Sequence, residues 1–208
     1  MGYRQAITDA GIDKDATAFL AFLDAQKETA RGKKAGVQGY CMGGPFTFHT
    51  AAVAPNRIGA VGSFHGAGLV TAEPSSPHLL IPRTKAAYLV AIAKNDDARQ
   101  PEAKDVLQAA FRAAGRAATV EVYPADHGWC VPGSQVYDEA SAEKACRAPV
   151  PTCSPASTRP LAAPTGSTRG CARFRSRRPT LSTTNSGPFA PTSRSEAERP
   201  APQTKLVL

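Results

Sequence analysis

Cys41 stands in a glycine-rich run whose spacing is typical of a nucleophile turn. Residues 39–44 read Gly-Tyr-Cys-Met-Gly-Gly, which has the form G-x-C-x-G-G. A run of the G-x-S-x-G type forms a sharp turn between a strand and a helix, and this turn lifts the central side chain clear of the sheet. Gly39 and Gly43 would supply the small flanks, because strand and helix nearly touch there. We therefore expect Cys41 to be a nucleophile and the Met42 N–H to be one oxyanion-hole donor.

A nucleophile of this kind needs a base and an acid that orients the base. His127 would act as general base and then as general acid, and a carboxylate at Asp96 or Asp97 would hold its imidazole in the required tautomer. The order nucleophile, acid, histidine along the chain is that of the α/β-hydrolases. Each residue also has a plainer interpretation: Cys41 as a buried inert thiol, the aspartates as helix caps, and His127 as a turn residue.

The other histidines and one further aspartate receive no catalytic role from their positions. His65 follows a different strand from the one that would position the base, so we expect it to be structural or to line the pocket. His49 falls within a helix and His78 within a loop, and neither stands in a catalytic pattern. Asp126 is expected to be a turn residue beside His127.

Strands and helices alternate along the first two-thirds of the chain, which favours a parallel α/β sheet with right-handed crossovers. Ligands bind at the carboxyl ends of the strands in such sheets. The candidate residues described above, with the exception of His49 and His78, fall at those ends. The predicted strands are residues 35–40, 58–64, 87–93 and 118–123, and the predicted helices are residues 9–27, 45–54, 101–114 and 137–145, with a loop up to about residue 84 and with residues 94–97 closing the third strand.

Two different compositions meet near Ala145. Residues 1–145 hold 15 Lys/Arg and 15 Asp/Glu, whereas residues 146–208 hold 10 Lys/Arg and 2 Asp/Glu and carry the whole net charge of +8. The second part is rich in Pro, Arg and Ser and lacks apolar periodicity, so it is expected to be a disordered tail. An arginine-rich arm that binds nucleic acid is the alternative, but stacking aromatics are almost absent. We therefore predict a domain over residues 1–145 and a disordered tail over residues 146–208.

The remaining features of the sequence set the expected compartment. No apolar run is long enough to span a bilayer, and the N-terminus lacks the pattern of a signal peptide. The five cysteines show neither a disulfide framework nor metal-ligand spacing, and free thiols fit a reducing compartment. We therefore expect a cytoplasmic protein, and nothing in the sequence indicates its oligomeric state.

Four motifs within residues 9–145 resemble the C-terminal two-thirds of the dienelactone hydrolase family. They are residues 39–44 (Gly-Tyr-Cys-Met-Gly-Gly), 63–66 (Ser-Phe-His-Gly), 91–97 (Ala-Ile-Ala-Lys-Asn-Asp-Asp) and 122–129 (Val-Tyr-Pro-Ala-Asp-His-Gly-Trp). The resemblance implies hydrolysis of an enol-lactone or related small ester by a Cys-Asp-His triad through a thioester acyl-enzyme, without metal or cofactor. By position, the triad would be Cys41, Asp96 and His127, with Asp97 as a competitor for the acid.

The chain departs from that family at both ends, which shapes the expected activity. The family has several strands before the helix that starts here near residue 9, and a packed helix where the Pro/Arg-rich tail stands here. We interpret the second departure as a shifted reading frame and expect a partial α/β-hydrolase fold with weak or absent activity. The alternatives are a general carboxylesterase or thioesterase, and an inactive α/β fragment whose basic tail binds acidic partners.

Overall fold

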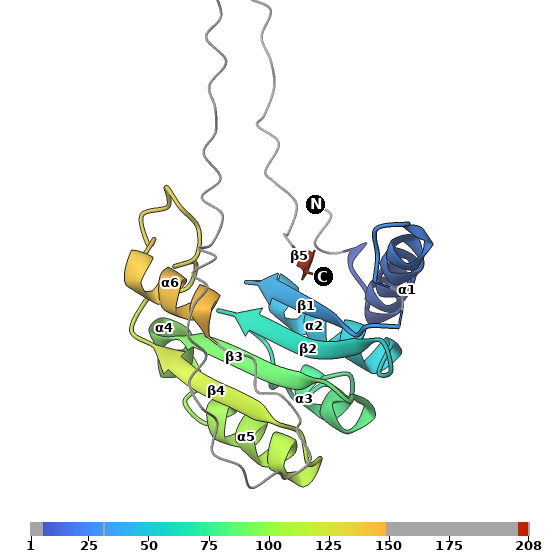
Figure 1. Ribbon diagram of the computed structural model, residues 1–208. Helices are drawn as coiled ribbons and strands as arrows, with labels where there is room; N and C mark the ends of the chain where they lie inside the picture. The colour runs from blue at the N-terminus through green and yellow to red at the C-terminus, as the bar shows by residue number, and fades with distance from the viewer. Residues whose placement is uncertain (1–5, 31, 149–203, 208) are drawn as a thin grey trace, which may run out of the picture. The chain divides into compact units, whose positions relative to one another are not determined.

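A computed structural model describes residues 6–30, 32–148 and 204–207 of the chain. Its centre is a sheet with the strand order β4-β3-β2-β1-β5 (Figure 1). The first four strands are parallel, and β5 pairs with β1 in the antiparallel direction. The strands are β1 (Ala35–Tyr40), β2 (Ile58–Phe64), β3 (Ala87–Ala93), β4 (Ala118–Tyr123) and β5 (Thr204–Val207).

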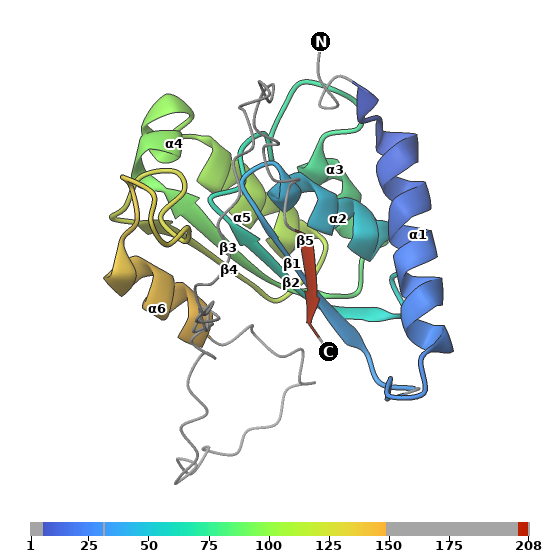
Figure 2. The same cartoon turned by 90° about the horizontal axis from the view of Figure 1, so that it is seen from above.

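Helices cover both faces of the parallel strands. Helices α2, α3 and α5 lie on one face and α6 on the other, while α1 packs beside α2 (Figures 1 and 2). None of the described helices is long and apolar enough to cross a membrane. The bounds are α1 (Asp9–Ala25), α2 (Gly43–Val53), α3 (Pro77–Leu80), α4 (Lys94–Arg99), α5 (Ala103–Ala113), α6 (Glu139–Arg147) and a short 3₁₀ helix, η2 (Ile81–Arg83).

Side-chain alternation in β3 divides the core between the two faces. Tyr88 and Val90 point into the cluster that also contains Phe48 of α2 and Phe111 of α5. The alternate residues of β3, Leu89, Ala91 and Ala93, belong to the second cluster. This cluster lies under α6 and also contains Tyr123, Trp129 and Ala145. All seven residues of β3 are buried. A continuous apolar strand of this kind is expected when a parallel sheet is covered on both sides.

The strand register aligns the four carboxyl ends at one edge of the sheet. Tyr40 pairs with Phe64, Phe64 with Ala91, and Ala93 with Tyr123. The residues that follow these ends are therefore neighbours in space although they lie far apart in the chain. This edge is where parallel α/β sheets bind ligands.

The four predicted parallel strands have the bounds that the sequence indicates, whereas two loops differ. The predicted loop after β2 contains α3 and η2, each of which carries a proline in its first turn, where the missing N–H costs nothing. Residues 94–97, which the sequence indicates only as the close of the third strand, begin α4. The predicted tail, residues 146–208, lies outside the described residues except for the end of α6 with Ala148 and β5.

The described cysteines differ in their state. Cys41 and Cys130 are free thiols. Cys146 is disulfide-bonded, which the spacing of the cysteines did not indicate. Burial raises the pKa of Cys130 to about 12, which makes this second free thiol a poor nucleophile near neutral pH.

Candidate active site

The turn between β1 and α2 has the geometry that the glycine run predicts. Cys41 has a φ of 52°, a left-handed conformation that is strained for a residue with a side chain. A Cβ atom at Gly39 would lie 2.1 Å from the carbonyl oxygen of Gly43. A Cβ at Gly44 would lie 2.6 Å from the Cα of Gly66, so strand and helix approach as closely as only glycine allows. Cys41 is exposed at the top of this turn.

Three side chains from three strand ends form a continuous chain of contacts. The Sγ atom of Cys41 lies 3.0 Å from Nε2 of His127. Nδ1 of His127 lies 2.6 Å from Oδ2 of Asp96. The carboxylate of Asp96 is largely buried, with 12% of the side chain exposed, and Nη1 of Arg99 lies 3.8 Å from its other oxygen. Of the two aspartates left open by the sequence, it is therefore Asp96 that contacts the histidine.

Asp97 and the backbone of His127 each have a polar partner of their own. Asp97 accepts a hydrogen bond from Nζ of Lys104 at 2.7 Å. The backbone N–H of His127 donates to Oδ1 of Asn95 at 2.9 Å. Asn95 stands next to Asp96 in α4, but its residue type alone carried no signal for this contact. Asp126 contacts Lys94 at 3.6 Å, which is consistent with a turn residue.

Met42 follows Cys41 and lies at the start of α2. It directly precedes α2, and backbone N–H groups at a helix start have no partner within the helix. The neighbouring Gly44 N–H is already bonded to the carbonyl oxygen of Cys41 at 3.1 Å. The N–H of the residue after the nucleophile is the donor that such turns provide.

His65 lies closer to Cys41 than its place in the sequence predicts. The Cys41 N–H donates to Nδ1 of His65 at 3.1 Å, and the His65 ring centroid lies 4.9 Å from that of His127. The imidazole is also in edge contact with Trp129. Burial, and secondly the nearby His127, lower the pKa of His65 to about 4. The expectation of a structural or pocket-lining residue did not include this contact, because it depends on the register between β1 and β2.

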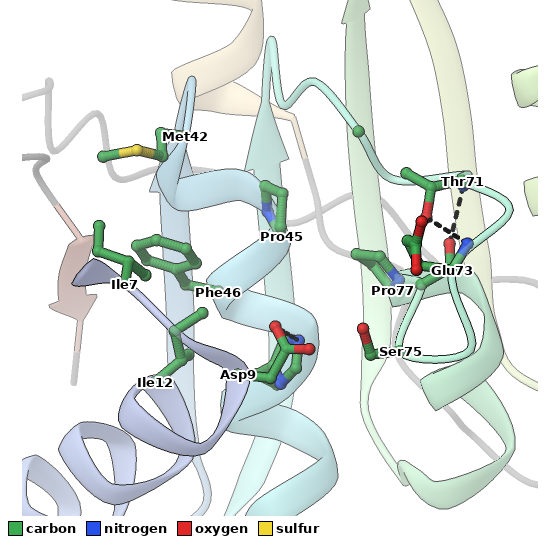
Figure 3. Close-up of a pocket in the computed structure, with 13 residues that line it drawn as sticks. Ile7, Asp9, Ile12, Met42, Pro45, Phe46, Thr71, Glu73, Ser75 and Pro77 are labelled. Atoms are coloured by element: carbon green, nitrogen blue, oxygen red, sulfur yellow. Dashed lines mark hydrogen bonds and ion pairs between the residues drawn. The ribbon is translucent and has the colours of Figure 1, made fainter. Parts of the chain in front are cut away.

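A pocket of about 290 Å³ opens beside the turn. Figure 3 shows Met42 at one end, with Ile7 and Phe46 on one side and Thr71 and Glu73 opposite. Its other lining residues are Asp9, Ile12, Pro45, His49, Gly68, Ser75, Ser76 and Pro77. Among these described residues there is no lysine or arginine, whereas Asp9 and Glu73 carry carboxylates.

The two histidines without a predicted role have structural contacts. Nδ1 of His49 in α2 lies 3.0 Å from Oδ1 of Asp13 in α1, and its Nε2 lies 3.6 Å from Asp9. This buried imidazole joins the two helices. Nδ1 of His78 lies 2.7 Å from Oγ of Ser76. Within the described ranges, no group of three His, Cys, Asp or Glu side chains is arranged to hold a metal ion.

The parallel sheet, the glycine turn and the residues at its strand ends define an α/β-hydrolase type of fold. The family model of the dienelactone hydrolase family matches residues 1–153, so the chain belongs to this family. The predicted family and fold class are thereby confirmed. A search among curated proteins finds no match.

Solved structures with the same fold include a putative dienelactone hydrolase from Klebsiella pneumoniae subsp. pneumoniae MGH 78578, with 24% identity and a TM-score of 0.58. A dienelactone hydrolase-like promiscuous phosphotriesterase, P91, from metagenomic libraries is similar at 25% identity with a TM-score of 0.55. A protein described as m3DLH follows at 22% and 0.55. Each match covers 66% of this chain, and the chain spans only 57% or 58% of those proteins.

Proposed function

We propose that the protein hydrolyses a small carboxylic ester or enol-lactone through a thioester on Cys41. The observation that carries this proposal is the unbroken series of contacts from Cys41 Sγ to His127 and from His127 to Asp96. Family membership supports a hydrolase. The cysteine in place of the usual serine supports a thioester intermediate, because the nucleophile becomes the acyl carrier.

The proposed reaction has two halves that share His127. In the first, Cys41 Sγ forms a bond to the carbonyl carbon and its proton passes to Nε2 of His127. The tetrahedral oxyanion would lie against the Met42 N–H. The carbon–oxygen bond then breaks, and His127 gives the proton to the leaving alkoxide.

In the second half, His127 takes a proton from water as the water oxygen attacks the thioester carbon. The carbon–sulfur bond breaks, the acid leaves, and the proton returns to Cys41. Throughout, the Asp96 carboxylate holds the His127 tautomer and stabilises the imidazolium form. The mechanism requires Cys41 as a free thiol, and Cys41 is free in the structure.

The pocket beside Met42 is the proposed place for part of the substrate. Apolar side chains such as Ile12 and Phe46 suit a short hydrocarbon group. The carboxylates of Asp9 and Glu73 face no lysine or arginine among the described lining residues, so an uncharged ester fits better than an anionic one. A neutral p-nitrophenyl ester is therefore the appropriate first probe.

The test compares the two free thiols of the described chain. With p-nitrophenyl acetate, Cys41→Ala is expected to lose at least about a hundredfold in kcat/KM, because removing a nucleophile removes the covalent route. Cys130→Ala is the matched control and should keep the parental rate, since that thiol is half-buried and its pKa lies at about 12. Equal rates in the parent protein and Cys41→Ala would refute the proposal and favour an inactive fragment.

A second candidate is hydrolysis of uncharged phosphotriesters. One similar structure is described as a promiscuous phosphotriesterase, and an uncharged triester also suits a pocket without cationic lining. The same Cys41 thiol would attack phosphorus in place of carbon. Measuring a p-nitrophenyl phosphotriester beside the acetate, with the same two variants, separates the two substrate classes.

A further inference from the structure

His65 is buried at the end of β2 and takes no part in the proposed proton transfers. Only 1% of the residue is exposed. Its backbone is held in place by a hydrogen bond from its N–H to the carbonyl oxygen of Ala91 in β3, at 2.8 Å. Its φ is 40°, a left-handed value that is strained for histidine. A strained residue persists where the surrounding structure fixes it, and such residues gather at functional sites.

The strain at His65 is connected directly to the strain at the nucleophile. Among the described residues, Cys41 and His65 are the two non-glycine positions with positive φ. A hydrogen bond joins them, from the Cys41 N–H to Nδ1 of His65 at 3.1 Å. The same N–H lies 3.1 Å from the carbonyl oxygen of Phe64, so two acceptors from the end of β2 hold it.

This hydrogen bond specifies the state of the imidazole. Nδ1 can accept only if it carries a lone pair, so the proton of the neutral ring is on Nε2. Nε2 is buried and has no hydrogen-bond partner among the described residues. Groups that face the ring are His127, Trp129 and Tyr40, and Asp96 acts on it electrostatically. With a pKa of about 4, the ring stays neutral near neutral pH.

We propose that His65 is a positioning residue: its neutral imidazole holds the Cys41 backbone in the strained turn, so that the thiol stays within reach of His127. The proposal rests on the proposed function, because it assigns His65 a part in the same Cys41 chemistry. Protonation of Nδ1 would place one N–H against another and release the turn. Neutrality also keeps a second positive charge away from the imidazolium of His127.

The test uses two replacements of similar shape. His65→Asn places an amide oxygen near the position of Nδ1, and asparagine tolerates positive φ. His65→Leu has a side chain that branches at Cγ as asparagine does, but it has no hydrogen-bond acceptor. The rate of Cys41 alkylation by iodoacetamide is measured against pH, together with kcat and KM for p-nitrophenyl acetate. We expect the leucine variant to lose about tenfold in alkylation rate and in kcat with KM nearly unchanged, and the asparagine variant to stay within about threefold of the parent protein.

Alkylation does not require ester hydrolysis, so it separates this proposal from the proposed function. A leucine variant with an unchanged melting curve and the parental alkylation rate would overturn the proposal. So would an asparagine variant that reacts as slowly as a folded leucine variant. If the leucine variant does not fold, long-range ¹H–¹⁵N spectra of the parent protein decide: the expected result is a neutral His65 with its proton on Nε2 at about pH 5.5, and a protonated ring or an Nδ1–H tautomer would contradict it.

Discussion

At the scale of single residues, the choice between Asp96 and Asp97 has the sharpest consequence. Asp96→Asn removes the carboxylate that contacts His127 Nδ1 at 2.6 Å. We expect kcat to fall by about a hundredfold or more, because the amide favours the wrong tautomer. Asp97→Asn is the matched control: it removes the negative charge that faces Lys104 and leaves the Asp96–His127 contact in place. Steady-state kinetics of both variants are the measurement, and a larger loss in Asp97→Asn would show that the acid is misassigned.

A second prediction at this scale concerns how His65 makes the free energy of unfolding of the protein depend on pH. Its pKa is lowered from 6.5 to about 4 in the folded protein. Between these values the unfolded chain binds a proton that the folded chain does not, so the free energy of unfolding falls as pH drops through 6.5 and levels off near 4. The full effect of this gap is about 3 kcal/mol.

Urea unfolding at several pH values measures this dependence. The comparison with His65→Asn isolates it, since the other titrating groups are common to both proteins. The variant should lose less stability on acidification than the parent protein. Parallel curves for the two proteins would mean that the pKa of His65 is the same in the folded and unfolded states.

At the scale of elements, the turn between β1 and α2 depends on glycine at its flanks. Gly39→Ala would place a Cβ 2.1 Å from the Gly43 carbonyl oxygen, where neither backbone can move freely. We expect a loss of about 1–3 kcal/mol in the free energy of unfolding. Gly11→Ala, whose Cβ would lie 3.2 Å from Thr8 Oγ1 at the start of α1, should change it by less than about 1 kcal/mol. Equal losses in urea unfolding would contradict a close-packed turn.

The parallel strands can be predicted from the sequence because their apolar residues are adjacent in the chain. The β3 run from Ala87 to Ala93 is apolar throughout, and apolar side chains on both faces of a covered parallel sheet leave no other arrangement. The glycine spacing around Cys41 likewise predicts a turn whose φ of 52° is observed. Features of this kind depend on residues that are close together in the sequence, so they can be predicted from it.

Contacts between elements were harder to foresee. The bond from the Cys41 N–H to His65 joins residues 24 positions apart, and its existence depends on the β1–β2 register rather than on either residue type. Asp96 and Asp97 are chemically identical, and only the helical turn of α4 directs one toward His127 and the other toward Lys104. The sequence does not indicate the short helices α3 and η2, because a proline at the start of a helix cannot be told from a proline in a loop.

At the scale of the whole molecule, the net positive charge and the proposed catalytic groups belong to different parts of the chain. Residues 1–145 contain equal numbers of acidic and basic side chains and every proposed catalytic group, whereas residues 146–208 carry the net charge of +8. Within the parts that the structure describes, β5 from this basic segment pairs along β1, the strand that leads to Cys41. The chain also spans less than two-thirds of the similar solved proteins, so its activity has to be measured on this chain itself.

The most direct measurement is to locate an acyl group after reaction with p-nitrophenyl acetate. The full chain is mixed with the ester, quenched in acid at successive times, digested and analysed by mass spectrometry. The account predicts a transient acetyl group on Cys41 that hydroxylamine removes and that Cys41→Ala lacks. Ester turnover that leaves Cys41 unmodified and continues unchanged in Cys41→Ala would contradict the central claim.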